Sequence, residues 1–284
     1  MVNMDDFNSD FENKWCPGCG NFFILEAMKR AFSTLNLSPE HILIVSGIGQ
    51  AAKTPHFLKC NMFHGLHGRA LPLATGAKAV NHDLTIIVNS GDGDCYGEGG
   101  NHFINAIRRN INITLLVHNN QVYGLTQGQA SPTSDKGMVT KVQPRGVILE
   151  PFNPIAVSLA LGAGFVARGF AGNKDQLSLL IQEGIKHKGF ALIDILQPCV
   201  SFNKTNTFGW YKKRVYDLSE TDHVPDDFDN AMKLSRQWEE KIPTGIFYQN
   251  VKPSYTQMID VLNQEPLVQR KYNPDCVEAL ISEL

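Results

Sequence analysis

The sequence has no excess of basic residues, no long apolar run and no dense set of cysteines. Its 284 residues carry a formal net charge of −2, whereas proteins that bind nucleic acids usually carry a basic excess. Residues 1–6 are acidic and lack the basic and apolar regions of an export signal. No apolar run approaches the roughly 18 residues of a membrane span. We therefore expect a cytoplasmic protein that neither binds nucleic acid nor spans a membrane.

Segments with helical spacing of apolar residues alternate with short apolar segments typical of buried strands. The predicted helices cover residues 22–35, 69–80, 100–109, 154–161 and 175–187. The predicted strands cover residues 41–46, 84–89, 113–118, 164–170 and 190–196. This alternation predicts an α/β fold, a parallel sheet with helices on both faces and with ligands at the carboxyl ends of its strands.

The regular alternation ends near Gln197, and the rest of the chain is rich in aromatic and charged residues. We therefore predict an α/β domain over residues 1–200 and a C-terminal extension over residues 201–284. The extension is expected to pack on the domain or on a partner subunit. Residues 124–143 form a polar segment without helical or strand period, which is typical of a functional loop.

Two short motifs each follow a predicted strand, Gly91-Asp92-Gly93 and Asn119-Asn120. Because the carboxyl ends of parallel strands meet at one edge of a sheet, we expect both motifs at the same ligand-binding edge. Mg²⁺ takes oxygen ligands, so Asp92 could supply a carboxylate, Asn120 an amide oxygen and Val122 a backbone carbonyl. Either motif alone is more often an ordinary turn. Their matched positions favour a site for Mg²⁺ and a diphosphate.

These motifs and several neighbouring segments resemble the β subunits of two-subunit 2-oxoacid:ferredoxin oxidoreductases, from about residue 15 to residue 217. The segments are Gly91-Asp92-Gly93-Asp94, Gly99-Gly100-Asn101-His102-Phe103, Arg108-Arg109-Asn110, Asn119-Asn120-Gln121-Val122-Tyr123-Gly124-Leu125-Thr126, Gly128-Gln129-Ala130-Ser131-Pro132-Thr133 and Asn206-Thr207-Phe208-Gly209-Trp210-Tyr211. The resemblance implies the pyrophosphate-type domain of the thiamine-diphosphate-binding fold, with Mg²⁺. It also implies that the pyrimidine-binding half, with its activating glutamate, lies on an alpha subunit.

The resemblance and the motifs together define a set of candidate cofactor-binding residues. They are Gly18, Cys19, Gly47, Ile48, Gly49, His67, Gly91, Asp92, Gly93, Asp94, Asn120, Val122, Gly124, Leu125 and Thr126. His67 is also a candidate catalytic residue, since a histidine titrates near neutral pH and could move protons at the cofactor. A single histidine is more often structural. Gln127 is the second candidate, because some relatives carry a lysine there that could pair with a substrate carboxylate.

The six cysteines are too few and too scattered for a disulfide scaffold in a chain of this length, so we expect thiols or metal ligands. The motif Cys16-Pro17-Gly18-Cys19 alone could bind zinc, act as a redox dithiol or form half of an iron–sulfur site. The resemblance implies a [4Fe–4S] cluster held by Cys16, Cys19 and Cys199. Many relatives have a further cysteine after Ser-Gly-Ile-Gly, where this chain has Gln50. Cys60 is the nearest candidate for the fourth ligand, although it could equally be a buried core residue. Cys95 and Cys276 are predicted to be structural.

The resemblance implies oxidative decarboxylation of a 2-oxoacid (2-oxoglutarate, pyruvate or a related acid) with coenzyme A. The products would be acyl-CoA and CO₂, and the electrons would pass through the cluster to ferredoxin. The expected assembly is a heterodimer or a dimer of heterodimers. Two alternatives remain: one polypeptide of a split, non-oxidative thiamine-dependent decarboxylase, and a structural zinc-binding interaction module. A structural zinc site usually takes two pairs of ligands, and a single pair of cysteines fits that poorly.

Overall fold

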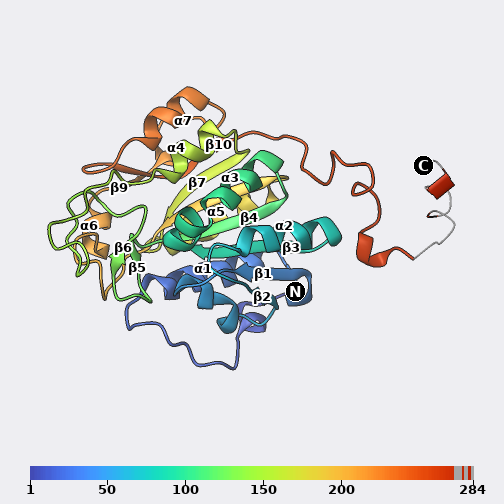
Figure 1. Cartoon of the computed structure of the whole chain (residues 1–284), viewed down its shortest axis with the longest axis horizontal. Coiled ribbons are helices and arrows are strands. Elements are labelled where there is room, and N and C mark those ends of the chain that lie inside the picture. The colour runs from blue at the N-terminus through green and yellow to red at the C-terminus, as the bar shows by residue number, and fades with distance from the viewer. Residues whose placement is uncertain (272–276, 278–280, 283–284) are drawn as a thin grey trace.

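The computed structural model describes residues 1–271, 277 and 281–282, and Cys276 lies outside this part of the chain. Its centre is an 8-stranded sheet with the order β2-β1-β3-β4-β8-β7-β10-β9 (Figure 1). Neighbouring strands run parallel, except that β10 is antiparallel to β7. The strands of this sheet are β1 (Ile42–Ser46), β2 (Asn61–His64), β3 (Thr85–Gly91), β4 (Ile113–Asn119), β7 (Phe165–Phe170), β8 (Phe190–Leu196), β9 (Val215–Asp217) and β10 (Ile242–Gln249).

Helices cover both faces of the sheet, as the alternation of segments predicts. The buried residues of one face come from α2 (Ala70–Val80), α3 (Gly100–Arg109), α4 (Pro154–Ala160) and α7 (Phe228–Ser235). Those of the other face come from α1 (Gly20–Thr34) and α5 (Lys174–Lys186). The short helix α6 (Phe208–Lys212) contributes to a smaller third cluster.

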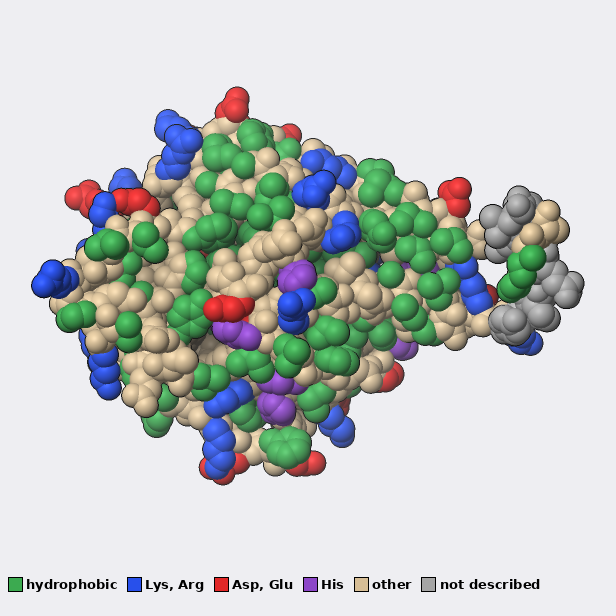
Figure 2. Space-filling view, viewed as in Figure 1, with side chains coloured by type: hydrophobic (Ala, Val, Ile, Leu, Met, Phe, Trp, Pro, Cys, Tyr) green, Lys and Arg blue, Asp and Glu red, His purple; other side chains and the backbone are tan. Residues whose placement is uncertain are grey.

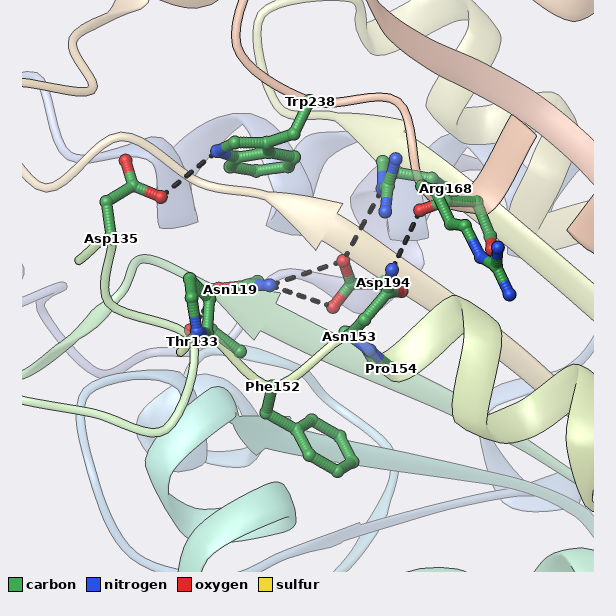
Figure 3. A pocket seen from close by; sticks show the side chains of 12 residues that line it. Asn119, Thr133, Asp135, Phe152, Asn153, Pro154, Arg168, Asp194 and Trp238 are labelled. Atoms are coloured by element: carbon green, nitrogen blue, oxygen red, sulfur yellow. Dashed lines mark hydrogen bonds and ion pairs between the residues drawn. The ribbon is translucent and has the colours of Figure 1, made fainter. Parts of the chain in front are cut away.

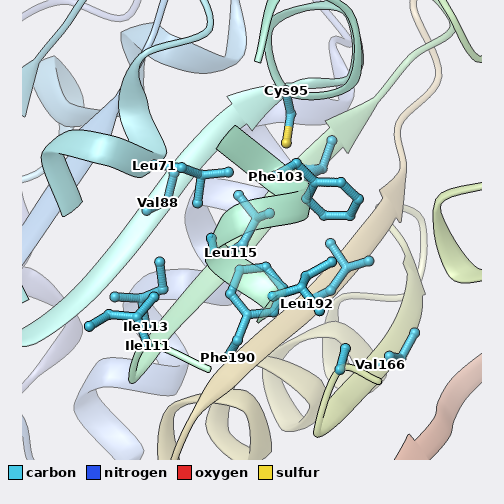
Figure 4. Packing of buried hydrophobic residues seen from close by; sticks show 14 of the residues in the cluster. Leu71, Val88, Cys95, Phe103, Ile111, Ile113, Leu115, Val166, Phe190 and Leu192 are labelled. Atoms are coloured by element: carbon cyan, nitrogen blue, oxygen red, sulfur yellow. The ribbon is translucent and has the colours of Figure 1, made fainter. Parts of the chain in front are cut away.

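The central strands are apolar on both sides because both of their faces are buried. On β4, Leu115 points into one core cluster and Leu116 into the other. On β8, Leu192 points into the same cluster as Leu115, and Ile193 into the same cluster as Leu116. Figure 4 shows Leu115 and Leu192 beside Phe103 of α3, in the core on the face that α3 covers. Burial of these mostly apolar strands on both faces stabilises the sheet. The loops at the edge of the sheet carry the candidate site.

The structure confirms the predicted elements to within a few residues at each end, and two parts of it are new. The chain between β1 and α2 contains a 3₁₀ helix (Ala51–Phe57) and the edge strand β2, neither of which has a clear apolar period. The sheet is also not wholly parallel, because β10 returns from the predicted extension and pairs antiparallel with β7. The polar segment 124–143 is largely irregular, as expected. Its only regular element is β6 (Gln129–Ala130), which pairs with β5 (Val122–Tyr123).

The chain after β10 runs across the molecule and away from it (Figure 1). Val251, Met258, Val261 and Val268 on this segment each expose more than half of their surface. Figure 2 shows hydrophobic side chains on this part of the viewed face. Among the described helices, none is both long enough and apolar enough to cross a membrane.

Candidate active site

A cavity of about 240 Å³ opens where β1, β3 and β4 reach the same edge of the sheet. The loops that follow these three strands form its walls, which is where a parallel sheet places its ligands. Most of the candidate cofactor-binding residues line it, namely Ile48, Gly49, His67, Gly91, Asp92, Gly93, Asp94, Asn120, Val122, Gly124, Leu125 and Thr126. Residues more than 70 positions apart in the sequence thus surround one space.

Asp92 is the buried acid of this cavity, with only 1% of its surface exposed. Its Oδ2 accepts hydrogen bonds from the hydroxyls of Ser131 (2.5 Å) and Thr133 (2.7 Å), and its Oδ1 has a long contact, 3.4 Å, with the backbone N–H of Asn120. Burial raises the pKa of Asp92, and these hydrogen bonds oppose the rise. Among the described residues, no cationic side chain pairs with it. A divalent cation at Oδ1 would supply the missing positive charge.

Asn120 is placed beside Asp92 by two hydrogen bonds of its side chain. Its Oδ1 accepts from the backbone N–H of Val122 (3.0 Å), and its Nδ2 donates to Oε1 of Gln197 (3.0 Å). The Oδ1 atom keeps a second lone pair, because an amide oxygen can accept twice. Asp92, Asn120 and the segment at Val122 therefore combine the hard oxygen donors that suit Mg²⁺.

Asp94 lines the cavity, but its carboxylate is already fully engaged with the protein. Its Oδ1 accepts from the backbone N–H groups of Ile48 (3.0 Å) and Gly68 (2.7 Å), and its Oδ2 accepts from the hydroxyl of Ser90 (2.5 Å). Gly47 lies against this carboxylate, since a Cβ on Gly47 would lie 2.6 Å from Cγ of Asp94. Asp94 thus ties the loop after β1 and the turn before α2 to the loop after β3.

His67 lies at the wall of the cavity between two acids. Its Nδ1 is 3.4 Å from Glu98 and its Nε2 is 3.7 Å from Asp94. The hydroxyl of Tyr123 donates to Glu98 at 3.1 Å, and the Tyr123 ring centre is 6.2 Å from that of His67. Burial and the nearby Glu98 raise the pKa of Tyr123, so this hydroxyl remains a donor at neutral pH. His67 therefore lies at the cavity wall beside two carboxyl groups and the Tyr123 ring.

Three of the predicted cofactor-binding residues and the candidate catalytic residue Gln127 do not line the cavity. Gly18 and Cys19 belong to the N-terminal cysteine motif, and Gly47 lies behind Asp94. Gln127 is exposed, with a left-handed backbone (φ 68°), just beyond Thr126 at the end of the lining segment.

The structure places Cys16 and Cys199 each near Cys19, although Cys199 is far away in the sequence. Burial raises the pKa of Cys19 to about 11, and the neighbouring Cys199 and Cys16 contribute to the rise. Burial alone raises the pKa of Cys60 to about 12, and Cys60 packs against the core formed by α1 and α5. The structure therefore does not place Cys60 with the other three thiols. In the described part of the chain, no group of three or more His, Cys, Asp or Glu side chains could hold a metal ion.

Gln197 connects Cys19 to Asn120 at the cavity wall. Its Nε2 donates to Sγ of Cys19 at 3.4 Å, while its Oε1 accepts from Asn120. Only 1% of its surface is exposed. One buried side chain thus touches both a candidate cluster ligand and a candidate magnesium ligand.

Sequence analysis missed several residues that shape this site. Gln50, Ala51 and Tyr123 line the cavity, and Ser131 and Thr133 bind Asp92. Within apolar strands, Arg168 on β7 and Asp194 on β8 are charged and yet buried. A charge inside a predicted buried strand is the pattern that could have identified the latter two, because buried charges need partners.

Comparisons with known proteins identify the family of this chain. The family described as "Thiamine pyrophosphate enzyme, C-terminal TPP binding domain" matches residues 44–195, and the family of C-terminal regions of the pyruvate ferredoxin oxidoreductase beta subunit matches residues 199–264. The chain is 46% identical over 260 residues to the 2-oxoacid:ferredoxin oxidoreductase subunit beta of Sulfolobus sp, covering 87% of this chain and 85% of that one. It is 44% identical over 264 residues to the 2-oxoacid:ferredoxin oxidoreductase 1, subunit beta, of Aeropyrum pernix, covering 89% and 83%.

A solved structure has the same fold over nearly the whole chain. It is the 2-oxoglutarate:ferredoxin oxidoreductase from Magnetococcus marinus with 2-oxoglutarate, coenzyme A and succinyl-CoA bound. The TM-score is 0.91 at 36% sequence identity, and the match covers 98% of this chain and 96% of that one. With a thiamine-type cavity at the sheet edge and relatives of this identity and coverage, the chain belongs to the beta subunits of the 2-oxoacid:ferredoxin oxidoreductases.

Proposed function

We propose that this beta subunit holds the diphosphate end of thiamine diphosphate and Mg²⁺ in the cavity at the ends of β1, β3 and β4. With an alpha subunit it would convert a 2-oxoacid and coenzyme A into acyl-CoA and CO₂ and pass the electrons to ferredoxin. The observation that carries the proposal is Asp92, a buried carboxylate without a cationic partner among the described residues, beside the amide oxygen of Asn120.

The residues at the cavity fit Mg²⁺ and a diphosphate. Asp92, Asn120 and the backbone carbonyl of Val122 would hold the metal ion, and Gly91 and Gly93 would let the chain approach the phosphates closely. Bound thiamine diphosphate would supply the electron sink for loss of CO₂ from the 2-oxoacid. His67, held between Asp94 and Glu98, would move protons at the rim.

The electron path would begin at Cys16, Cys19 and Cys199. Their grouping supports three ligands of a [4Fe–4S] cluster, since cysteine thiolates are the usual ligands of such clusters. The fit is incomplete, because Cys60 does not join them among the described residues. Gln197 supports a location of the cluster next to the cofactor, because it contacts both Cys19 and Asn120.

The substrate side is proposed more broadly than for the Magnetococcus marinus enzyme, whose structure holds 2-oxoglutarate and coenzyme A. Gln127, at the end of the lining segment, has no charge with which to pair a second carboxylate. We therefore propose 2-oxoglutarate, pyruvate or a related 2-oxoacid, with specificity completed by the alpha chain. The proton and electron chemistry at the shared 2-oxo group is the same for all of them.

An exposed apolar loop supports a docking surface for the alpha subunit. Val139, Val142, Ile148 and Leu149 each expose at least 59% of their surface. Ile148 and Leu149 border a large groove that also includes Tyr123, a wall residue of the cofactor cavity. Exposed apolar patches of this kind often mark protein interfaces. We propose a heterodimer or a dimer of heterodimers in the cytoplasm, where thiols such as Cys16 and Cys199 stay reduced.

Metal and cofactor content test this proposal. The chain would be purified anaerobically with its alpha subunit, and iron, acid-labile sulfide, zinc, magnesium and thiamine diphosphate would be measured per chain. About four iron atoms and one thiamine diphosphate would support the oxidoreductase. Thiamine diphosphate without iron would instead favour the split non-oxidative decarboxylase. Zinc without thiamine diphosphate would favour the structural zinc module and overturn the proposal.

A further inference from the structure

Figure 3 shows the residues that line a second cavity, which has a volume of about 180 Å³. Asn119, Thr133, Arg168 and Asp194 line it. Thr133 also donates a hydrogen bond to Asp92, which lines the cofactor cavity. Hydrogen-bonded polar side chains therefore connect the two cavities.

Asp194 is at one end of this chain of hydrogen bonds, and only 1% of its surface is exposed. Nδ2 of Asn119 donates to both of its carboxylate oxygens, at 3.1 and 3.2 Å, and the hydroxyl of Tyr96 donates at 3.0 Å. Arg168, its neighbour across β7 and β8, places Nε 3.8 Å away. Because the amide nitrogen of Asn119 must face this carboxylate, its Oδ1 must face the other way.

The side-chain oxygen of Asn119 contacts Thr133. Oδ1 of Asn119 lies 2.8 Å from the Thr133 hydroxyl, which is in turn 2.7 Å from Oδ2 of Asp92. The hydroxyl proton of Thr133 is within reach of both acceptors, and the two contacts together therefore fix the orientation of the hydroxyl. With Ser131 also bound to Oδ2, that oxygen is held by two hydroxyls. Only Oδ1 of Asp92 then remains for a metal ion.

We propose that Asn119 and Thr133 are positioning residues for Asp92, with Asp194 as their anchor. Asp194 orients Asn119, Asn119 orients Thr133, and Thr133 fixes the Asp92 carboxylate with Oδ1 toward the cofactor cavity. The inference rests on the proposed function, because it requires Mg²⁺ at Asp92. Residues that orient a metal ligand commonly change metal affinity about 10- to 100-fold when they are replaced.

The test measures metal-dependent binding rather than activity. The chain in complex with its alpha subunit would be stripped of cofactor, and thiamine diphosphate binding would be followed by calorimetry over a series of Mg²⁺ concentrations. Thr133→Val, which keeps the shape and removes the hydroxyl, should raise the half-saturating Mg²⁺ concentration at least about 10-fold. Thr133→Ser, which keeps the hydroxyl, should stay within about 2-fold of the wild type.

Two further variants test the chain of contacts. Asn119→Ala should raise the Mg²⁺ requirement like Thr133→Val, and the double variant should be no worse than the poorer single one, because the two residues act in series. Ser235→Ala is the matched control: Ser235 lines the same second cavity, but its hydroxyl bonds the Met232 carbonyl outside this chain of contacts. It should leave Mg²⁺ binding unchanged.

Three outcomes would overturn the inference. The first is a wild-type Mg²⁺ requirement in Thr133→Val, and the second is a double variant whose effect equals the product of the single effects. The third is a wild-type complex that binds no thiamine diphosphate at any Mg²⁺ concentration, which would overturn the proposed function as well. If Asn119→Ala does not fold, the contrast between Thr133→Val and Thr133→Ser still decides.

Discussion

Gly47→Ala should destabilise the protein although Gly47 does not line the cofactor cavity. A Cβ at this position would overlap the carboxylate of Asp94 and lie 2.6 Å from its Cγ, and real Cβ atoms essentially never come within 3.0 Å of such a neighbour. Asp94 has little room to move, because it is 3% exposed and accepts hydrogen bonds from Ile48, Gly68 and Ser90.

The size of the effect follows from those contacts. Hydrogen bonds to a charged group are worth about 1.5–3 kcal/mol each, and a shift of Asp94 would weaken at least one of them. We therefore expect Gly47→Ala to lower the free energy of unfolding by about 2–4 kcal/mol. For a chain of this size that is a fall of roughly 4–8 °C in Tm. Thiamine diphosphate binding should weaken as well, because Ile48 lines the cavity.

Thermal unfolding and calorimetry measure both effects, with Gly76→Ala as the matched control. Gly76 is exposed within α2, and a Cβ there would meet nothing within 4 Å. Its replacement should stabilise the protein by about 0.5–1 kcal/mol, since alanine is favoured over glycine in a helix interior. If Gly47→Ala is as stable as the wild type and binds the cofactor equally well, Asp94 is not the rigid tie that its contacts indicate.

Three further predictions concern other parts of the molecule. Burial lowers the pKa of His118 to about 3, so the native state stays neutral while the unfolded chain takes up a proton below pH 6.5. Stability should therefore fall by about 1.4 kcal/mol per pH unit between roughly pH 6 and pH 4, and denaturant titrations should show a shallower slope for His118→Gln. Cys199→Ser should reduce the iron bound per complex and Cys60→Ser should not; equal losses would contradict the grouping of the thiols. Gly93→Ala, whose Cβ would overlap the Tyr123 ring, should weaken thiamine diphosphate binding in calorimetry, and unchanged affinity would show that this ring is free to move.

Much of the fold could be predicted from the sequence, because burial on both faces of a sheet leaves a local pattern. The segments that form β3, β4 and β8 are short and mostly apolar, and the helices between them keep helical spacing. The edge strand β2 has no such pattern, since all four of its residues are exposed. The antiparallel strand β10 could not be predicted in this sheet either, because its pairing with β7 joins segments far apart in the sequence.

Only some residues of the candidate site could likewise be predicted from the sequence. Asp92 and Asn120 could be identified from the sequence, because their positions after β3 and β4 bring them to one edge of the sheet. The distant groups that surround them became evident only from the packing of the whole chain. That packing places Cys16 and Cys199 near Cys19, leaves Cys60 half-buried against the core, and brings Asp194 to Asn119. Contacts of this kind depend on how whole strands and loops meet, and no local spacing of residues encodes them.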